Sequence, residues 1–305
     1  MMKRIALLVI GLLPLTAACG DPTGPLLEPD ERCGRDGSAV AAFPSPGLAA
    51  AVRQTLSIGA NVPLTCARVT SLTTLAADFA GISDLAGAQN LTGLTDLILA
   101  GNSIVDLSPL SVLTTLEFLD LRENEITDLS PLGGLTGLIG LSLSRNSITD
   151  IGALTGHTNL VLLGLDYNQI EDIGPLSGLV RLSRLVLYDN SIRDLSPLSG
   201  LVDLALLDLG ENRAPDLTPL SGLVDLGVLG LERMGITDVE PLTDLTLLTT
   251  LVLSENISLS DIQPLIDNVG LLRFSTVHLD GTNVSCMDIE ALEAKGVTVI
   301  SPCPS

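Results

Sequence analysis

Leu-Thr-Thr-Leu-Glu-Phe-Leu-Asp-Leu-Arg-Glu-Asn, residues 113–124, contains the frame Leu-x-x-Leu-x-Leu-x-x-Asn that recurs along most of the chain. Seven asparagines end this frame at spacings of 22 or 44 residues: Asn102, Asn124, Asn146, Asn168, Asn190, Asn212 and Asn256. A fixed period between about 20 and 50 residues indicates a solenoid, in which each unit covers the apolar face of its neighbour. The period therefore predicts one elongated domain that works by presenting a surface.

Each repeat contains one short strand and one sharp turn. Leu119-Asp120-Leu121 alternates apolar and polar residues as a strand does, and such strands are expected to stack in parallel. The amide of Asn124 is expected to bond the backbone groups that the following turn leaves without a sheet partner, so the asparagines form a ladder. Ten repeats begin near Val69, Leu91, Leu113, Leu135, His157, Leu179, Leu201, Leu223, Leu245 and Leu271.

The second half of each repeat predicts short 3₁₀ turns on the convex side. Asp128-Leu129-Ser130-Pro131-Leu132 offers capping side chains and a proline that fits a first helical turn. Nine aspartates share this capping position: Asp84, Asp106, Asp128, Asp150, Asp172, Asp194, Asp216, Asp238 and Asp261. Five glycines are expected to close the turn in a left-handed conformation: Gly134, Gly156, Gly178, Gly200 and Gly222.

Two irregularities stand near the end of the array. Met234 replaces a ladder asparagine, which predicts either a water in its place or a buried unpaired group that costs about 1–3 kcal/mol. The repeat that begins at Leu245 has 26 residues and therefore a longer convex segment.

Composition excludes several classes of protein. The 305-residue chain is 46% hydrophobic, with a mean hydropathy of +0.49, but no stretch of 18 residues after the N-terminal segment is free of polar side chains. Its net charge of −21 argues against binding nucleic acid, which requires clustered Lys and Arg. The acidity is interpreted as a solvated surface and not as calcium storage, because no Asp-x-Asp-x-Asp-Gly loop occurs.

The N-terminus reads as an export signal. Residues 1–18 contain a basic start, an apolar run and small residues, and Leu15-Thr16-Ala17-Ala18-Cys19 resembles a bacterial lipobox. The resemblance implies acylation of Cys19 and a membrane anchor through this lipid. Gly20 and not aspartate follows the cysteine, and the resemblance to a lipobox therefore implies sorting to the outer membrane. The alternative is ordinary cleavage after Ala18 with a free Cys19; residues 19–42 are expected to form a flexible tether.

Four further cysteines predict two disulfides. Stacked strands about 4.8 Å apart separate the ends of the array by roughly 40 Å, and bridged Cα atoms lie within about 7 Å of each other. The pairings that fit are Cys33 with Cys66 and Cys286 with Cys303. A metal site is improbable, because no close Cys/His cluster occurs.

The repeats resemble those of bacterial internalin-type leucine-rich repeat proteins. The strings Asn-x-Ile-x-Asp-Leu-Ser-Pro-Leu and the segment Phe43–Val52 ahead of them carry the resemblance, which covers about residues 43–303. It implies an α/β fold of the leucine-rich repeat solenoid type, with a curved parallel sheet on the concave face. The resulting division is an N-terminal cap at 43–68, the repeat array at 69–285 and a C-terminal cap at 286–305. Internalins bind host receptors on the concave face, so host adhesion is one hypothesis.

Residues between the inward leucines of each strand are expected on the concave face, where a ligand would bind. Both tyrosines of the chain fall there, one repeat apart, next to arginines, and these residue types are enriched at protein contacts. The alternative is that long side chains simply cover the sheet. The predicted partner-binding residues are Phe118, Arg122, Arg145, Leu162, Asp166, Tyr167, Arg184, Val186, Tyr188 and Leu206.

No motif indicates catalysis or a cofactor. His157 stands where other repeats begin with Leu, and His278 has no nearby nucleophile in the sequence. The leading hypothesis is a monomeric, non-enzymatic lipoprotein of the bacterial cell envelope that binds a protein, or less readily a glycan. The alternative is an envelope scaffold or spacer without a selective ligand. A cytosolic phosphatase regulator with similar repeats conflicts with the export signal.

Overall fold

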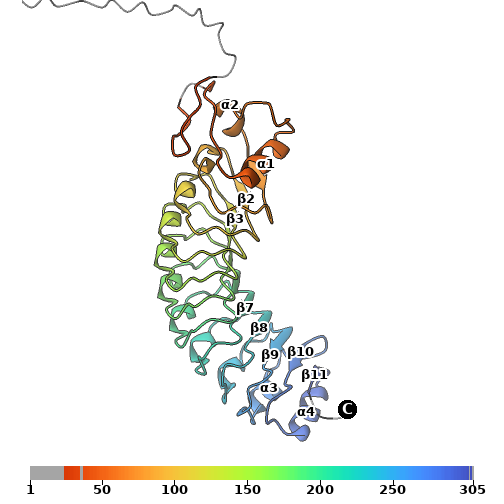
Figure 1. Cartoon of the computed structure of the whole chain (residues 1–305). Coiled ribbons are helices and arrows are strands. Elements are labelled where there is room, and N and C mark those ends of the chain that lie inside the picture. The colour runs from red at the N-terminus through yellow and green to blue at the C-terminus, as the bar shows by residue number, and fades with distance from the viewer. Residues whose placement is uncertain (1–23, 35–36, 302, 304–305) are drawn as a thin grey trace, which may run out of the picture.

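The protein is a curved solenoid whose strands form one parallel sheet. The structure is a computed structural model that describes residues 24–34, 37–301 and 303. Eleven strands follow one another across the sheet in chain order, and the array bends gently from one capped end to the other (Figure 1). The strands are β1 Thr74–Ala76, β2 Asp96–Ile98, β3 Phe118–Asp120, β4 Gly140–Ser142, β5 Leu162–Gly164, β6 Arg184–Val186, β7 Leu206–Asp208, β8 Val228–Gly230, β9 Thr250–Val252, β10 Thr276–His278 and β11 Thr298–Ile300. The predicted fold is confirmed.

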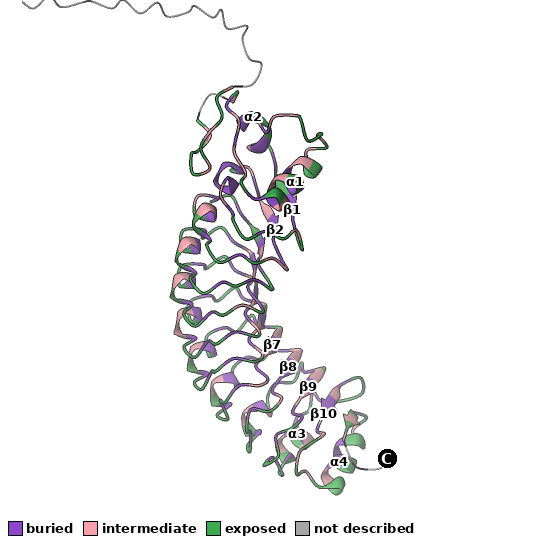
Figure 2. Ribbon diagram, in the orientation of Figure 1, coloured by how far each residue is buried: buried purple, intermediate pink, exposed green. Residues whose placement is uncertain are grey.

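The 22-residue period sets the register of the sheet. Leu119 of β3 pairs with Leu141 of β4, which pairs with Leu163 of β5, so equivalent residues of successive repeats lie side by side. The middle residue of nearly every strand is buried, and one apolar core runs the length of the array (Figure 2). The first and third residues of each strand consequently point to the concave side, free of the demands of the core.

Short 3₁₀ helices form the convex side, as predicted. They are η1 Ala88–Asn90, η2 Ser108–Leu110, η3 Ser130–Leu132, η4 Gly152–Leu154, η5 Gly174–Leu176, η6 Ser196–Leu198, η7 Thr218–Leu220 and η8 Glu240–Leu242. Each of the nine repeated aspartates accepts a hydrogen bond from the backbone N–H two residues later. Bonds from the backbone and side chain of Ser130 lower the pKa of Asp128, and bonds from the side chain and backbone of Thr218 lower the pKa of Asp216. The 26-residue repeat has room for a true helix, α3 Gln263–Asp267.

The asparagine ladder joins each repeat to the one before it. Asn124 Nδ2 donates to the carbonyls of Leu99 and Leu121, both at 3.0 Å, and its Oδ1 accepts from Ile104 N, also at 3.0 Å. All seven ladder asparagines repeat this pattern. Each therefore satisfies buried backbone groups of two repeats at once.

At Met234 the ladder loses one acceptor only. The carbonyls of Leu209 and Leu231 keep donors from Asn212 and Asn256. Among the described residues, the buried amide of Ala214 has no hydrogen-bond acceptor, because an asparagine at position 234 would have supplied it.

The prediction of left-handed glycines at the convex turn is wrong. Gly178 and Gly200 have open space where a side chain would begin, and none of the five predicted glycines has a positive φ. The left-handed residue instead precedes the ladder position, where the chain leaves the strand. Non-glycine residues occupy it in eight repeats: Phe79, Glu123, Arg145, Tyr167, Asp189, Glu211, Arg233 and Glu255, with φ between 50° and 61°. This conformation turns their side chains out along one rim of the concave face.

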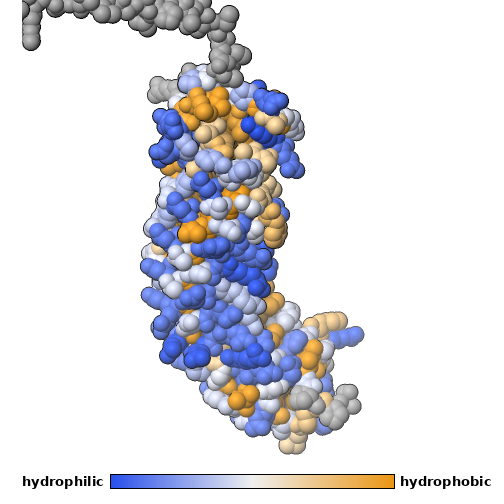
Figure 3. Space-filling model, viewed as in Figure 1, coloured by the Kyte–Doolittle hydropathy of each residue, from blue (hydrophilic) through white to orange (hydrophobic). Residues whose placement is uncertain are grey.

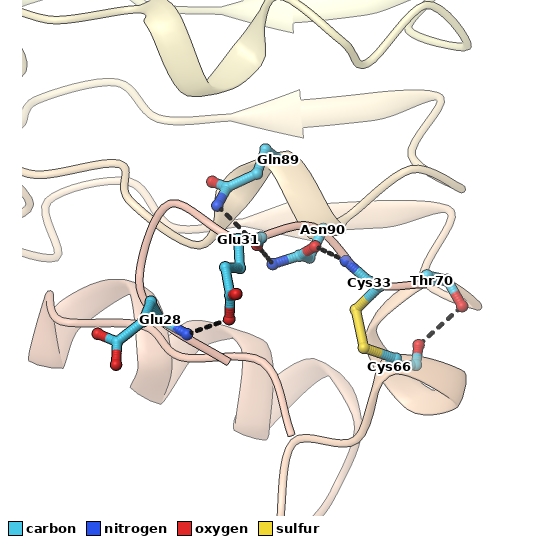
Figure 4. The surroundings of a disulfide bond; sticks show 7 residues. All are labelled: Glu28, Glu31, Cys33, Cys66, Thr70, Gln89 and Asn90. Atoms are coloured by element: carbon cyan, nitrogen blue, oxygen red, sulfur yellow. Dashed lines mark hydrogen bonds between the residues drawn. A yellow bond between two sulfur atoms is a disulfide. The ribbon is translucent and has the colours of Figure 1, made fainter. Parts of the chain in front are cut away.

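The N-terminal cap is larger than predicted. It contains α1 Pro46–Thr55 and α2 Cys66–Val69, and a disulfide joins Cys33 to Cys66 with the Cα atoms 5.5 Å apart. The described part of residues 24–42 is not a free tether: Leu27 N donates to Val40 O, and the Asn90 side chain bonds to Cys33 N and Glu31 O (Figure 4). These bonds cover the open end of the array. The predicted signal peptide, Cys19 and the start of the tether lie outside the described residues.

The C-terminal cap closes the other end. Helix α4, Cys286–Glu293, is followed by Gly296 in a left-handed conformation and by β11, and the second predicted disulfide joins Cys286 to Cys303. Lys295 Nζ donates to the carbonyls of Leu265, Ile266 and Asn268, which anchors the cap to the repeat that begins at Leu245. Within the described ranges no helix is both long and apolar enough to cross a membrane. Figure 3 shows hydrophilic side chains along the middle of the array.

Candidate functional site

The concave face carries a hollow between β2 and β6, which we call the concave hollow. Its floor is formed by Gly140, Ser142 and Gly164, and its volume is about 680 Å³. Phe118 and Leu162 lie on either side of Gly140 in the same row of the sheet, and both are exposed. Gly140 is buried under the Phe118 ring, whereas Ser142 and Gly164 in the next row are partly exposed, so the hollow lies where strand residues have small side chains or none.

Aromatic side chains lean over glycines of the next repeat. A side chain on Gly140 would begin 2.7 Å from Cδ1 of Phe118, and one on Gly210 would begin 2.8 Å from Cδ2 of Tyr188. Such cross-strand pairs cover the exposed backbone of glycine in a sheet. They also hold the aromatic rings in place, which lowers the entropy that binding would cost.

A row of aromatic and charged side chains runs along the rim of the concave face. The Arg145 guanidinium lies 4.0 Å from the ring centre of Tyr167, whose ring centre lies 5.4 Å from that of Tyr188. The Tyr188 hydroxyl donates to Glu211 Oε1 at 3.4 Å, and Glu211 pairs with Arg233 at 2.5 Å. Burial, together with Glu232 and Glu211, raises the pKa of Tyr188 to about 12, so the phenol stays a hydrogen-bond donor.

The two halves of the concave face differ in charge. The hollow half, from Asp96 to Tyr188, balances four acids against three arginines: Asp96, Asp120, Glu123 and Asp166 against Arg122, Arg145 and Arg184. The acidic half, from Asp189 to Asp280, has one arginine for six acids: Arg233 against Asp189, Asp208, Glu211, Glu232, Glu255 and Asp280. Burial and the nearby Asp166 raise the pKa of Asp208.

The structure distributes the ten predicted binding residues over two adjoining places. Seven line the concave hollow: Phe118, Arg122, Arg145, Leu162, Asp166, Arg184 and Val186. Tyr167 and Tyr188 belong to the rim, and Leu206 follows Arg184 in the next strand. The hollow spans residues 96–186 and therefore extends to β2, a strand that precedes all ten predicted residues.

Sequence reasoning missed the floor of the hollow. Gly140, Ser142, Gly164 and Ser144 occupy concave strand or rim positions, but their small size was not taken as a sign of a depression. The signal is present in the sequence: where the repeat at Leu113 has Phe118 and Asp120, the next repeat has Gly140 and Ser142, and the repeat after it has Leu162 and Gly164.

Neither histidine is placed for catalysis. His157 is fully buried in the leucine core, and its two ring nitrogens have no hydrogen-bond partner among the described residues. Burial lowers the pKa of His157, so the ring is neutral and cannot meet a substrate. His278 lies in β10 on the concave face. No cluster of three or more His, Cys, Asp or Glu side chains within the described ranges could hold a metal ion.

Known structures and families agree with this architecture. Residues 114–156 and 158–199 match the family described as Leucine Rich repeats (2 copies). An internalin (inlF) from Listeria monocytogenes is 27% identical, with a TM-score of 0.65 over 85% of this chain and 90% of its own. Internalin C2 from the same organism is 31% identical, with a TM-score of 0.58 over 84% of this chain and 94% of its own.

A Leptospira interrogans leucine-rich repeat protein shares the fold at 22% identity, with a TM-score of 0.56 over 70% of this chain and 50% of its own. No curated protein sequence matches the chain significantly.

Proposed function

We propose that this chain, which belongs to the internalin-like leucine-rich repeat proteins, is a non-enzymatic module that binds a protein partner on the concave face of its sheet. The observation that carries the proposal is the concave hollow with its rim. It combines exposed aromatic rings, arginines and a depression of about 680 Å³ at residues that the core does not constrain. Buried aromatic and arginine anchors dominate the free energy of most protein interfaces.

The strands present these groups with little freedom to move. Phe118 and Tyr188 rest on glycines of the next repeat, and Arg145 lies over Tyr167. A surface whose side chains are already ordered loses less entropy on binding than a surface of free side chains. This order favours recognition over the role of a simple spacer.

The test is capture of a partner by the mature chain, residues 20–305, from envelope and foreign-cell lysates. A variant in which Tyr167, Arg184 and Tyr188 are all alanine keeps every core leucine, so it should fold with both disulfides but retain little of the partner. Val180→Ala, an exposed residue on the flank of the array, is the matched control. If the triple variant captures as much partner as the wild type, or if no stoichiometric partner is found, the spacer hypothesis is favoured.

We also propose that the chain is anchored to the outer membrane by a lipid on Cys19. The support is the lipobox-like sequence Leu15–Cys19 with Gly20 after it. Because the N-terminal cap closes one end of the array, an anchor there would leave the concave face free along its length (Figure 1). Replacing Cys19 with Ser should abolish labelling with radioactive palmitate and release the protein from the membrane fraction. Unchanged labelling would contradict the proposal.

A further inference from the structure

We infer that the concave hollow recognises an acidic side chain that lies next to an apolar one in a segment of the partner protein. This inference rests on the proposed function and names the chemistry of the segment that would bind. Two observations carry it: Arg184 has no acidic partner in the described part of the chain, and it lies in the same row of the sheet as the exposed side chains of Leu162 and Phe118.

Internal contacts satisfy nearly all of the charged groups around the hollow. Arg122 pairs with Asp120 at 2.7 Å. Thr95 Oγ1 donates to Asp96 at 2.6 Å, and Ser144 Oγ donates to Asp166. Arg145 lies over Tyr167 and 4.0 Å from Glu123. These groups have local partners and therefore contribute little free attraction for a ligand.

Arg184 differs from the other arginines of the concave face. Arg122, Arg145 and Arg233 each have an acidic partner within 4.0 Å, whereas the Arg184 guanidinium has no ion pair or side-chain hydrogen bond among the described residues. It is an exposed cation in a chain with net charge −21. A guanidinium presents a planar fork of donors that matches a carboxylate. Of the three arginines described around the hollow, Arg184 is the one whose guanidinium is free to bind a carboxylate, so the site for an anion is local to Arg184 within a hollow of four acids and three arginines.

The row of residues that contains Arg184 supplies the apolar part of the site. Phe118, Gly140, Leu162 and Arg184 are successive partners across the sheet. Adjacent strands lie about 4.8 Å apart, so Leu162 is about 5 Å and Gly140, with the Phe118 ring over it, about 10 Å from Arg184 along the row. Two side chains separated by two residues of an extended segment, or by three or four residues of a helix, span roughly this distance.

An apolar side chain over the floor would contact Leu162 and the Phe118 ring that covers Gly140. An aspartate or glutamate two to four residues away would then reach the Arg184 guanidinium. A lysine at that point would face an unpaired cation, which disfavours basic segments. The hollow therefore discriminates by charge as well as by shape.

A displayed library of random dodecapeptides, panned against the oxidised mature chain, tests the inference. Selected peptides should carry Asp or Glu two to four residues from an aromatic or aliphatic residue. Arg184→Ala should weaken their binding by at least about tenfold, as expected for loss of a charge-assisted hydrogen bond. Arg184→Glu should select Lys or Arg at the same peptide position. Arg193→Ala, which removes an exposed arginine that lies 3.8 Å from Glu171, is the control and should not change binding.

The outcomes separate this inference from the proposed function. Peptides that need Phe118 and Leu162 but bind Arg184→Ala as tightly as the wild type would overturn the inference and leave concave binding intact. Peptides that tolerate Phe118→Ala and Leu162→Ala together, or a library from which nothing is retained, would contradict both.

Discussion

The hollow half and the acidic half of the concave face are built on the same repeat but present different surfaces. In the hollow half, arginines balance the acids and small residues leave a depression; in the acidic half, six acids surround one arginine. Below both halves lie the same leucines and, apart from Met234, the same ladder asparagines. The comparison shows that the frame residues make the fold and that the residues between them distinguish one repeat from another.

Substitutions of core leucines should cause the largest losses of stability. These losses should be equal in the two halves, because both halves share the core. Leu141 lies under the hollow half and Leu229 under the acidic half, 2% and 0% exposed respectively. Replacing either by Ala should lower the free energy of unfolding by about 2–5 kcal/mol. Urea denaturation of the oxidised protein measures this loss. A loss below about 1 kcal/mol in one half would mean that the core is not continuous.

Substitutions in the asparagine ladder should change the free energy of unfolding in opposite directions in the two halves. Asn146→Ala removes bonds to Leu121 O, Leu143 O and Ile126 N, so it should cost about 2–3 kcal/mol. Met234→Asn should instead stabilise the acidic half, by less than about 1 kcal/mol, because it supplies an acceptor to Ala214 N but buries less apolar surface. The same denaturation experiment applies. Destabilisation by Met234→Asn would show that apolar packing outweighs the missing bond.

His157 should make the hollow half sensitive to acid. Its pKa is lowered in the folded state, so below the unfolded value of 6.5 the unfolded chain binds the additional proton and stability falls as pH falls. His157→Leu restores the repeat and should stabilise the protein by about 1–2 kcal/mol at pH 7.5. The difference in the free energy of unfolding between His157→Leu and the wild type should grow as the pH falls below 6.5, by at most about 1.4 kcal/mol per pH unit.

The control is His278→Gln in the acidic half, on the concave strand β10. Its effect on stability should stay below about 1 kcal/mol at each pH. Parallel pH profiles of the wild type and His157→Leu would contradict the assignment of a buried neutral imidazole.

The smallest effects concern the convex turns, where both halves are alike. Gly178 and Gly200 have open space beside them and no left-handed backbone. Replacing either by Ala should stabilise the protein by about 0.4–1 kcal/mol, because the unfolded chain loses freedom. Thermal denaturation detects the gain. Gly101→Ala, at a φ of 67° and against the Phe79 ring, should destabilise and serves as the contrast.

Most of the fold could be predicted because the spacing of Leu and Asn is a property of the chain itself. The strands, the ladder and the 3₁₀ turns follow from positions that recur, and the two disulfides follow from the distance that the stacked repeats place between the two ends. The left-handed residue could not be located, because polar and aromatic residues such as Glu123 and Tyr167 occupy it and their backbone N–H groups bond to the next repeat. In the repeat that begins at Leu271, Phe274 stands where the preceding repeats have a buried leucine, and the structure turns it outward, 82% exposed and with a φ of 84°.

The candidate site was predicted in part. Exposed residues such as Phe118 and Arg184 could be identified, because alternation along a strand assigns them to the concave face. The hollow could not, because its volume depends on which small residues meet across strands. The unpaired state of Arg184 likewise depends on the distances to every neighbouring acid.

The most direct test of the central claim places a photo-crosslinking amino acid on each surface in living cells. Ser142 lies on the floor of the hollow, Thr250 on the acidic half and Ser199 on the convex side. The account predicts one discrete protein adduct from position 142 and none from position 199, with less or none from position 250. An adduct from position 250 or 199 without one from position 142 would contradict it.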